Sequence, residues 1–139
     1  MRFVERVVFD TSTLVSAALR VESTPAQAFR KALAGHEICT SPDTLRKLEN
    51  VLLRAKFDRY LDRSERSAFL DLYRKVTTSC DVRESAKACR DPKDDKFLAL
   101  AVSCAAVVLV SSDHDLLDLH PFRGVAIMTP ADFLEHRRR

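Results

Sequence analysis

The sequence has little of what marks several common protein classes. It holds two tyrosines, Tyr60 and Tyr73, and no tryptophan in 139 residues, which is too few for a surface that stacks nucleic-acid bases. Its longest apolar run is 13 residues, from Leu98 to Val110 with Ser103 inside it, whereas a membrane-spanning helix needs about 20. Charged residues precede the first apolar stretch, so no secretory signal and no membrane partner are expected.

Cysteine is also sparse, and its spacing matches no common pattern. The four cysteines, Cys39, Cys80, Cys89 and Cys104, form no C-x-x-C pair. A thiolate metal site and a disulfide framework are therefore both unsupported. We expect reduced, mostly buried thiols in a cytoplasmic protein.

Excess charge of one sign is nearly absent. The net charge is only +3, which by itself does not indicate binding to nucleic acid. Basic residues do gather after residue 53, and a weak RNA-backbone patch is one interpretation, but the acids interleaved with them favour an ordinary solvated surface. The basic group comprises Arg54, Lys56, Arg59, Arg63 and Arg66.

The composition and the absence of linkers indicate one globular domain. Hydrophobic residues make up 46% of the chain and charged residues 31%, as in soluble folded proteins. No linker, repeat or low-complexity tract interrupts the chain, so residues 1–139 are expected to form a single domain.

Apolar periodicity and local signals predict alternating strands and helices. Thr24-Pro25, Ser41-Pro42 and Thr129-Pro130 each place a hydroxyl before a proline, as at helix starts, and Gly35 and Gly124 are expected to end helices that precede strands. Strands are predicted at 7–9, 37–40, 80–82, 107–110 and 125–128, and helices at 26–34, 43–54, 64–76, 94–104 and 131–136. This order predicts an α/β fold, a three-layer α/β/α sandwich with a central parallel sheet of four or five strands.

Acidic residues follow two of the apolar strands and begin one of the helices. Because ligands bind beyond the carboxyl ends of parallel strands, and the helix leading into a strand begins near that edge, we expect these acids to lie at one edge. They are Asp10 after the first strand, Asp113 and Asp115 after 107–110, and Asp91, Asp94 and Asp95 at the helix start.

Helix capping explains part of this set. Aspartate is a favoured N-cap, and an acid in a first turn contributes about 0.3–1 kcal/mol. Capping does not explain why two apolar strands both end in carboxylates. Clustered carboxylates repel unless a cation neutralises them, and oxygen ligands favour Mg²⁺ or Mn²⁺. A site of this kind activates water and shields phosphate charge, so hydrolysis of a phosphodiester is predicted.

Five segments, in order, resemble PIN-domain nucleases: "VVFDTSTLVSA", "SPDTLRKLENVLLRAKF", "CRDPKDDKFLALA", "LVSSDHDLLDL" and "GVAIMTPADFL". The most similar branch contains the toxins of bacterial toxin–antitoxin pairs. The resemblance implies a small α/β/α fold, Mg²⁺- or Mn²⁺-dependent cleavage of single-stranded RNA, an antitoxin protein as partner, and frequent homodimers.

The resemblance also assigns residues. Asp10, Asp95 and Asp113 match three family acids and would be both catalytic and metal-binding, with Asp115 as an auxiliary metal ligand. Residues expected to support them, by hydrogen bonding to a ligand carboxylate or a bound water or by lying beside the ligands, are Ser12, Ser111 and Asp94.

One position departs from the family pattern. Where the second helix usually carries an acid, an ungapped alignment places Lys47. Glu49 is two residues on and therefore about 200° around the helix, at about 100° per residue. Three interpretations stay open. Lys47 pairs with the aspartates and weakens or abolishes catalysis, leaving an RNA- or protein-binding module; three aspartates still hold one metal; or Glu49 replaces the missing acid.

A second enzyme class shares the first segment. "FDTSTLV" is similar to the nucleophile loop of haloacid-dehalogenase-type phosphatases, which read D-x-D-x-T. Ser12 stands where that loop has its second aspartate, and no later lysine is placed to match. A phosphatase is therefore the lesser alternative.

Overall fold

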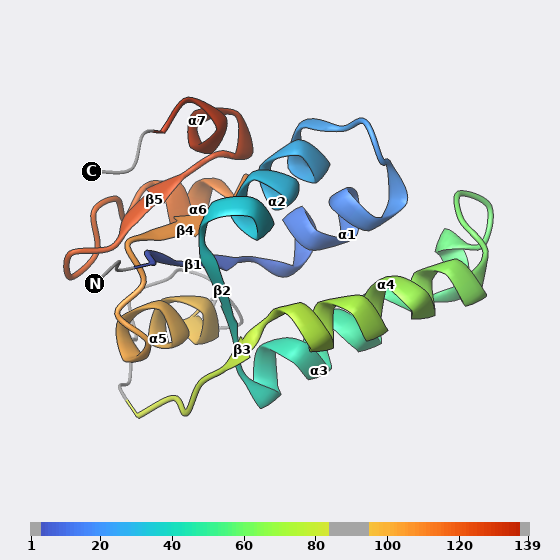
Figure 1. Cartoon of the computed structure of the whole chain (residues 1–139), viewed down its shortest axis with the longest axis horizontal. Helices are drawn as coiled ribbons and strands as arrows, with labels where there is room; N and C mark the ends of the chain where they lie inside the picture. The colour runs from blue at the N-terminus through green and yellow to red at the C-terminus, as the bar shows by residue number, and fades with distance from the viewer. Residues whose placement is uncertain (1–3, 84–94, 137–139) are drawn as a thin grey trace.

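The computed structural model describes residues 4–83 and 95–136. Within them, five strands form one parallel sheet in the order β3-β2-β1-β4-β5 (Figure 1). The strands are β1 (Arg6–Phe9), β2 (Glu37–Thr40), β3 (Thr78–Ser79), β4 (Val108–Val110) and β5 (Ala126–Met128). The predicted parallel sheet is confirmed.

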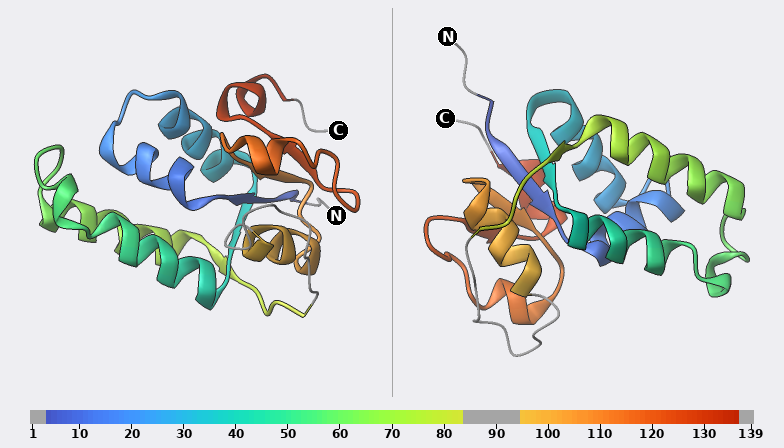
Figure 2. Two further views of the ribbon diagram at one scale, coloured as in Figure 1. Left: turned by 180° about the vertical axis from the view of Figure 1, so that it is seen from behind. Right: turned by 90° about the horizontal axis from the view of Figure 1, so that it is seen from below.

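Helices cover both faces of this sheet and complete the three layers (Figures 1 and 2). The first face packs against α1 (Thr11–Leu19), α2 (Thr24–Gly35), α3 (Pro42–Leu52), α4 (Arg63–Val76) and α7 (Pro130–Glu135). The second face packs against α5 (Asp95–Ser103) and α6 (His114–Leu117). The predicted α/β/α sandwich is thus confirmed. None of the helices in the described ranges has the length and apolar character that crossing a membrane requires.

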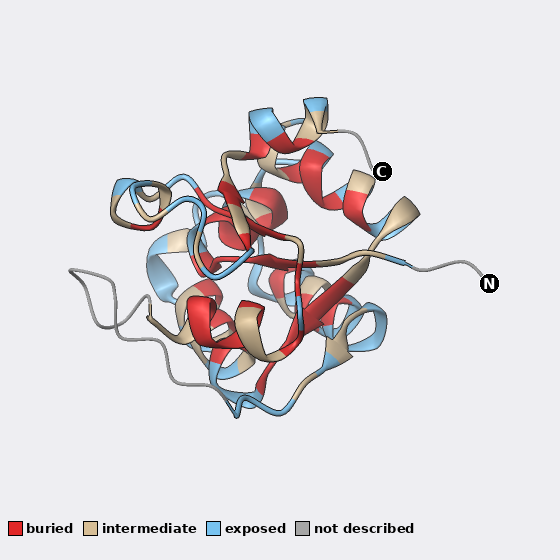
Figure 3. Ribbon diagram, turned by 90° about the vertical axis from the view of Figure 1, so that its left-hand side faces the viewer, coloured by how far each residue is buried: buried red, intermediate tan, exposed pale blue. Residues whose placement is uncertain are grey.

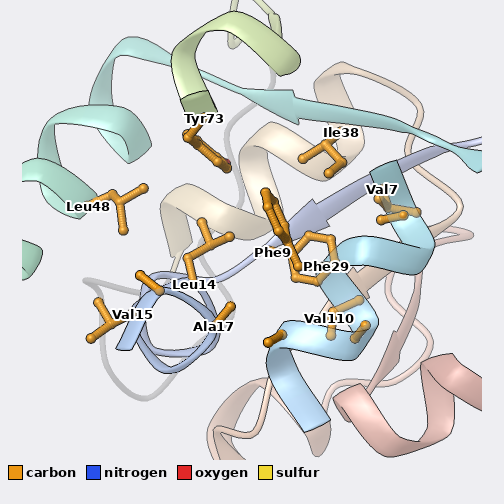
Figure 4. Close-up of a cluster of buried hydrophobic side chains, with 14 of the residues drawn as sticks. Val7, Phe9, Leu14, Val15, Ala17, Phe29, Ile38, Leu48, Tyr73 and Val110 are labelled. Carbon is orange, nitrogen blue, oxygen red and sulfur yellow. The ribbon is translucent and has the colours of Figure 1, made fainter. Parts of the chain in front are cut away.

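The strands divide their side chains between two cores because successive residues point to opposite faces. Val7 and Phe9 enter the first core, whereas Val8 enters the second. Phe9 is central in the first core, where it lies against Phe29 (Figure 4). Its ring makes edge-on contacts with Phe29 and Phe133 at centroid distances of 5.9 and 6.1 Å. Figure 3 shows the resulting burial along the strands. Burial on both faces explains why these strands read as continuous apolar runs.

The strand order reverses at β1, which lies between β2 and β4. Phe9 pairs with Val110, and the backbone N–H of Asp10 donates to the carbonyl oxygen of Val110 at 3.1 Å. The residues that leave β1 and β4 are therefore adjacent in space. A reversal of this kind opens a crevice at the carboxyl edge of an α/β sheet.

Two of the three predicted helix caps are confirmed. Ser41 accepts a hydrogen bond from the backbone N–H of Thr44, and Thr129 accepts one from Asp132. The third prediction was wrong by one residue, because Ser23 caps α2 and Thr24 is its first residue. At the start of α3, Ser41 and Thr44 form a capping box, in which each side chain bonds the other residue's backbone N–H.

Both glycine predictions were wrong. Gly35 belongs to the last turn of α2, and His36 is the C-cap. Gly124, with φ of +85°, lies in the tight turn between Phe122 and Val125, where a left-handed backbone favours glycine. The strand predicted at 80–82 was also wrong, because the strand lies at Thr78–Ser79 and ends before Cys80.

Arg66 is a structural residue and does not belong to a surface patch. Its side chain is fully buried beneath the turn joining α3 to α4, two helices that lie side by side (Figure 2). It donates to the carbonyl oxygens of Leu52, Arg54 and Leu61 at 2.8–3.1 Å and pairs with Asp58. The guanidinium therefore donates to the carbonyl oxygens of Leu52 and Leu61 and adds a second donor to that of Arg54, which also accepts from the backbone N–H of Phe57.

Candidate functional site

A pocket of about 380 Å³ opens where β1 and β4 end. Its lining combines carboxylates and hydroxyls with apolar side chains and one lysine. The lining residues are Asp10, Thr11, Ser12, Val15, Ser16, Lys47, Val51, Phe57, Phe97 and Asp113. This is the edge at which the sequence predicts a site.

Asp10 is fixed by the chain on both sides of it. It is the N-cap of α1, and its Oδ1 accepts hydrogen bonds from the backbone N–H of Thr13 at 3.0 Å and the hydroxyl of Ser12 at 3.4 Å. Its Oδ2 accepts from the hydroxyl of Ser111 at 2.5 Å. Only 4% of the residue is exposed. The carboxylate is therefore held in one orientation at the pocket wall.

Ser111 connects the two strand ends. Its fully buried hydroxyl donates to Asp10 and accepts from the backbone N–H of Asp113 at 2.9 Å. Asp113 in turn caps α6, because its Oδ1 accepts from the N–H of Asp115 at 2.8 Å. Capping and pocket lining are thus combined in the same side chains, Asp10 and Asp113.

Lys47 reaches the same pocket from α3. Its Nζ lies 5.1 Å from the centroid of the Phe97 ring, within the range of a cation–π contact. The ion pairs found among the described residues include none with Lys47. Lys47 therefore lines the pocket together with Asp10 and Asp113 without forming a direct salt bridge to either.

Glu49 points elsewhere. It accepts a hydrogen bond from Arg74 of α4 at 2.5 Å and is absent from the pocket lining. As their angular separation on the helix predicts, Lys47 and Glu49 face different parts of the structure: Lys47 lines the pocket, and Glu49 contacts α4. Of the three interpretations of the missing acid, the one that uses Glu49 has no support in this arrangement.

Asp95 is the first residue of α5 and is half-buried. It is not among the pocket-lining residues, although Phe97 in the same helical turn is. In the described ranges, Asp10, Asp95 and Asp113 do not form a group whose ligand atoms all lie within 4.8 Å of one another. Asp115 is half-buried in α6. Asp91 and Asp94 lie outside the described residues, so the complete ligand set stays a prediction.

A second pocket, of about 390 Å³, shares Lys47 and Val51 with the first. Four of its lining residues are basic and one is acidic; the full lining is Asp43, Arg46, Lys47, Asn50, Val51, Arg54 and Lys96. Asp43 pairs with exposed Arg46 at 3.4 Å. Two basic residues of this pocket, Arg46 and Lys96, were given no role in the sequence analysis. The four-residue spacing of Arg46, Asn50 and Arg54 could have indicated Arg46. Lys96 has no such signal, because only the fold brings it to this pocket.

The protein is thus an α/β protein whose carboxylates lie where the strand order of a parallel sheet reverses. The basic pocket beside them favours an anionic ligand. The sequence matches the PIN domain family over residues 6–115. The chain therefore belongs to the PIN-domain family, as its resemblance to that family implies.

One curated relative and one solved structure are similar to this chain over nearly its whole length. The uncharacterized protein MJ1680 of Methanocaldococcus jannaschii is 24% identical over 143 residues, which cover 94% of this chain and 90% of that protein. The crystal structure of PAE2754 from Pyrobaculum aerophilum superimposes with a TM-score of 0.61 at 20% identity, covering 95% of this chain and 88% of the other.

Two further solved structures are similar to this chain at lower sequence identity. VapBC2 from Rickettsia felis, bound to a DNA fragment from its promoter, gives a TM-score of 0.60 at 13% identity and covers 89% of this chain and 98% of the other. Mycobacterium tuberculosis VapC20, a toxin that cleaves the sarcin-ricin loop, gives 0.55 at 14% identity, covering 86% and 98%. These similarities show that the chain has the same fold.

Proposed function

We propose that this protein is a divalent-metal-dependent ribonuclease that hydrolyses phosphodiester bonds in single-stranded RNA. One observation carries the proposal. Asp10 and Asp113, held through the shared hydroxyl of Ser111, line one pocket at the strand ends, and Lys47 lines it with them. Membership of the PIN-domain family is consistent with this chemistry.

The donor atoms fit a hard cation. Asp10 and Asp113 offer carboxylate oxygens, which suit Mg²⁺ or Mn²⁺, and only one oxygen of Asp113 is used to cap α6. We propose Asp95 and Asp115 as the further ligands, and Ser12 as a donor to a ligand carboxylate. When bound, the metal supplies a more acidic water and neutralises phosphate charge.

The remaining contributions come from the chain. Ser111 holds Asp10 in place, so the carboxylate needs no reorientation when substrate arrives. Lys47 donates to a non-bridging phosphate oxygen of the RNA, which gives it a role other than ligation. The basic pocket that contains Arg46, Arg54 and Lys96 binds the adjoining phosphates, and such contacts supply most of the sequence-independent affinity.

A second candidate is a PIN domain that binds RNA or a protein without cutting. The observation that favours it is Lys47 in a pocket where the family usually has an acid. The phosphatase alternative gains nothing from this pocket, because exposed Ser12 stands where that chemistry needs a carboxylic acid.

The decisive experiment compares cleavage of a single-stranded RNA by wild type, Asp10→Asn, Asp95→Asn and Lys47→Glu in Mg²⁺ and in Mn²⁺. Asparagine is also a good N-cap, so Asp10→Asn is expected to keep α1 folded while it removes the ligand charge. We expect wild type to cut, and both aspartate variants to lose activity.

Two outcomes would contradict the ribonuclease. Cleavage by Lys47→Glu alone would assign the natural protein to the second candidate. Undiminished cleavage by Asp10→Asn would show that the activity does not use this pocket. Calorimetric titration with Mn²⁺ checks the same point, because wild type should give a binding heat that Asp10→Asn lacks.

We further propose that the protein is a toxin restrained by an antitoxin. Structures of the same fold include VapBC2 and VapC20. Induced expression of wild type should then arrest bacterial growth, and expression of Asp10→Asn should not. Normal growth with a wild type that cuts RNA in vitro would contradict the toxin role and leave the nuclease intact.

A further inference from the structure

Three cysteines from distant parts of the sequence meet on the face of the sheet covered by α5. Cys39 lies in β2, Cys80 follows β3, and Cys104 follows α5. Their sulfur atoms all lie within 4.8 Å of one another. All three are free thiols. In the described ranges this is the one group of three or more potential metal ligands at such distances.

We propose that Cys39, Cys80 and Cys104 form a binding site for one thiophilic cation, Cu⁺ or Zn²⁺. Thiolates select these two ions, whereas the oxygen donors at the carboxylate pocket select Mg²⁺ or Mn²⁺. The thiol site lies on the α5 side of the sheet and is independent of the proposed nuclease.

The sulfur geometry is close to what one ion requires. With metal–sulfur bonds of about 2.3 Å, two sulfurs on the same ion lie about 3.8–4.0 Å apart. Contraction from the present separations, which are at most 4.8 Å, therefore amounts to about 1 Å or less. Rotation of the three side chains can supply such a shift without moving the strands.

The surroundings also suit a thiolate–metal centre. Cys39 and Cys104 are 1% and 2% exposed, among apolar side chains of the second core, and Cys80 is half-buried at its margin. A dry apolar shell protects metal–thiolate bonds from water. Three sulfurs suit three-coordinate Cu⁺, and Zn²⁺ would take water as its fourth ligand on the Cys80 side.

Arg6 supplies a compensating charge and marks an access route. Its Nη1 donates to the backbone carbonyl of Cys104 at 3.1 Å, and its Nε pairs with Glu37 at 3.4 Å. Arg6, Glu37 and Cys104 line an open pocket of about 600 Å³. A bound thiolate–metal group is anionic, so a fixed guanidinium beside it favours binding.

Thiolate character supports the geometric case. A hydrogen bond from the Cys39 thiol lowers the pKa of Cys104 to about 7, against the opposing effect of burial. The same pairing, together with burial, raises the pKa of Cys39. The thiolate is the form that binds metals, so a lowered pKa at Cys104 favours metal binding.

The test uses the full chain, reduced and kept free of oxygen. Cu⁺ is titrated in competition with bicinchoninate, and Zn²⁺ in competition with a chromophoric chelator, for wild type, Cys80→Ser and Cys89→Ser. Cys80 is the least buried of the three, so its loss perturbs packing least. Cys89, which lies outside the described residues, provides a control with the same number of thiols.

We expect one equivalent of one of these ions per chain, with thiolate-to-metal charge-transfer absorption. Loss of a supporting residue near a metal costs about 10–100-fold in affinity, so loss of a direct ligand in Cys80→Ser should cost more than about 100-fold. Cys89→Ser should bind as wild type does, and Asp10→Asn should too, which separates this site from the carboxylate pocket.

Three results would overturn the proposal. They are no binding of either ion by the reduced protein, equal weakening by Cys80→Ser and Cys89→Ser, or binding unchanged in Cys80→Ser. Thermal melting of the metal-free variants verifies folding, and Co²⁺ substitution gives a second readout through its sulfur charge-transfer bands.

Discussion

Replacing Ser111 by alanine tests the contact on which the carboxylate pocket depends. The buried hydroxyl donates to Asp10 and accepts from the backbone N–H of Asp113. Alanine fills nearly the same volume, so the change removes two hydrogen bonds and leaves the packing almost intact. The exposed neighbour Ser112 offers a matched control, since Ser112→Ala removes the same group from the next residue.

The magnitude follows from the two bonds. A hydrogen bond to a charged group is worth about 1.5–3 kcal/mol, and the second bond about 0.5–1.5 kcal/mol. Ser111→Ala should therefore lower the free energy of unfolding by about 2–4.5 kcal/mol, a large part of the about 5–15 kcal/mol typical of a domain. Ser112→Ala should stay within about 0.5 kcal/mol of wild type.

Urea denaturation followed by circular dichroism measures both variants. The midpoint should fall for Ser111→Ala with an unchanged slope. In an Asp10→Asn background the bond becomes neutral, so the cost of Ser111→Ala should shrink by about 1–1.5 kcal/mol. Equal effects of Ser111→Ala and Ser112→Ala, or no coupling to Asp10, would refute the bridging role. Mn²⁺ affinity should fall about 10–100-fold in Ser111→Ala.

Two other substitutions test neighbouring parts of the structure. Arg66→Ala should destabilise the protein by about 3–6 kcal/mol, because the carbonyl oxygens of Leu52 and Leu61 each lose a charged donor. Urea denaturation of exposed Arg63→Ala is the control, and equal effects would contradict the buried role of Arg66. Glu49→Gln should cost at most about 1 kcal/mol, since its pair with Arg74 is 40–45% exposed. Its RNA cleavage rate should match wild type, and a large loss would identify Glu49 as a ligand after all.

The sheet was the most predictable part of the fold. The strands at 7–9, 37–40 and 107–110 appear within one residue of the predicted bounds. Burial on both faces makes 7–9 and 107–110 unbroken apolar runs, which are easily recognised. Helix α1 was not predicted. Its first residues, Thr11, Ser12 and Thr13, have low helix propensity, and packing of Leu14 against the first core outweighs that preference.

The sequence predicted the location of the candidate site better than it predicted which residues form it. The rule for parallel sheets correctly placed Asp10 and Asp113 together, and helical geometry correctly separated Lys47 from Glu49. The thiol cluster gave no local signal, because Cys39, Cys80 and Cys104 are far apart in sequence. Only the pairing of β2 with β3, and the packing of α5 across them, brings those sulfurs together.

Asp10 has two roles, because the same carboxylate is the N-cap of α1 and lines the pocket. Selection for folding alone would keep a helix-capping residue at position 10, either aspartate or asparagine, whether or not the pocket holds a metal. Lys47 caps no helix, so it is free to change when the chemistry of the pocket changes. Among natural variants of this chain, asparagine at position 10 or a new residue at position 47 should therefore mark a change in the chemistry of the pocket within an unchanged fold.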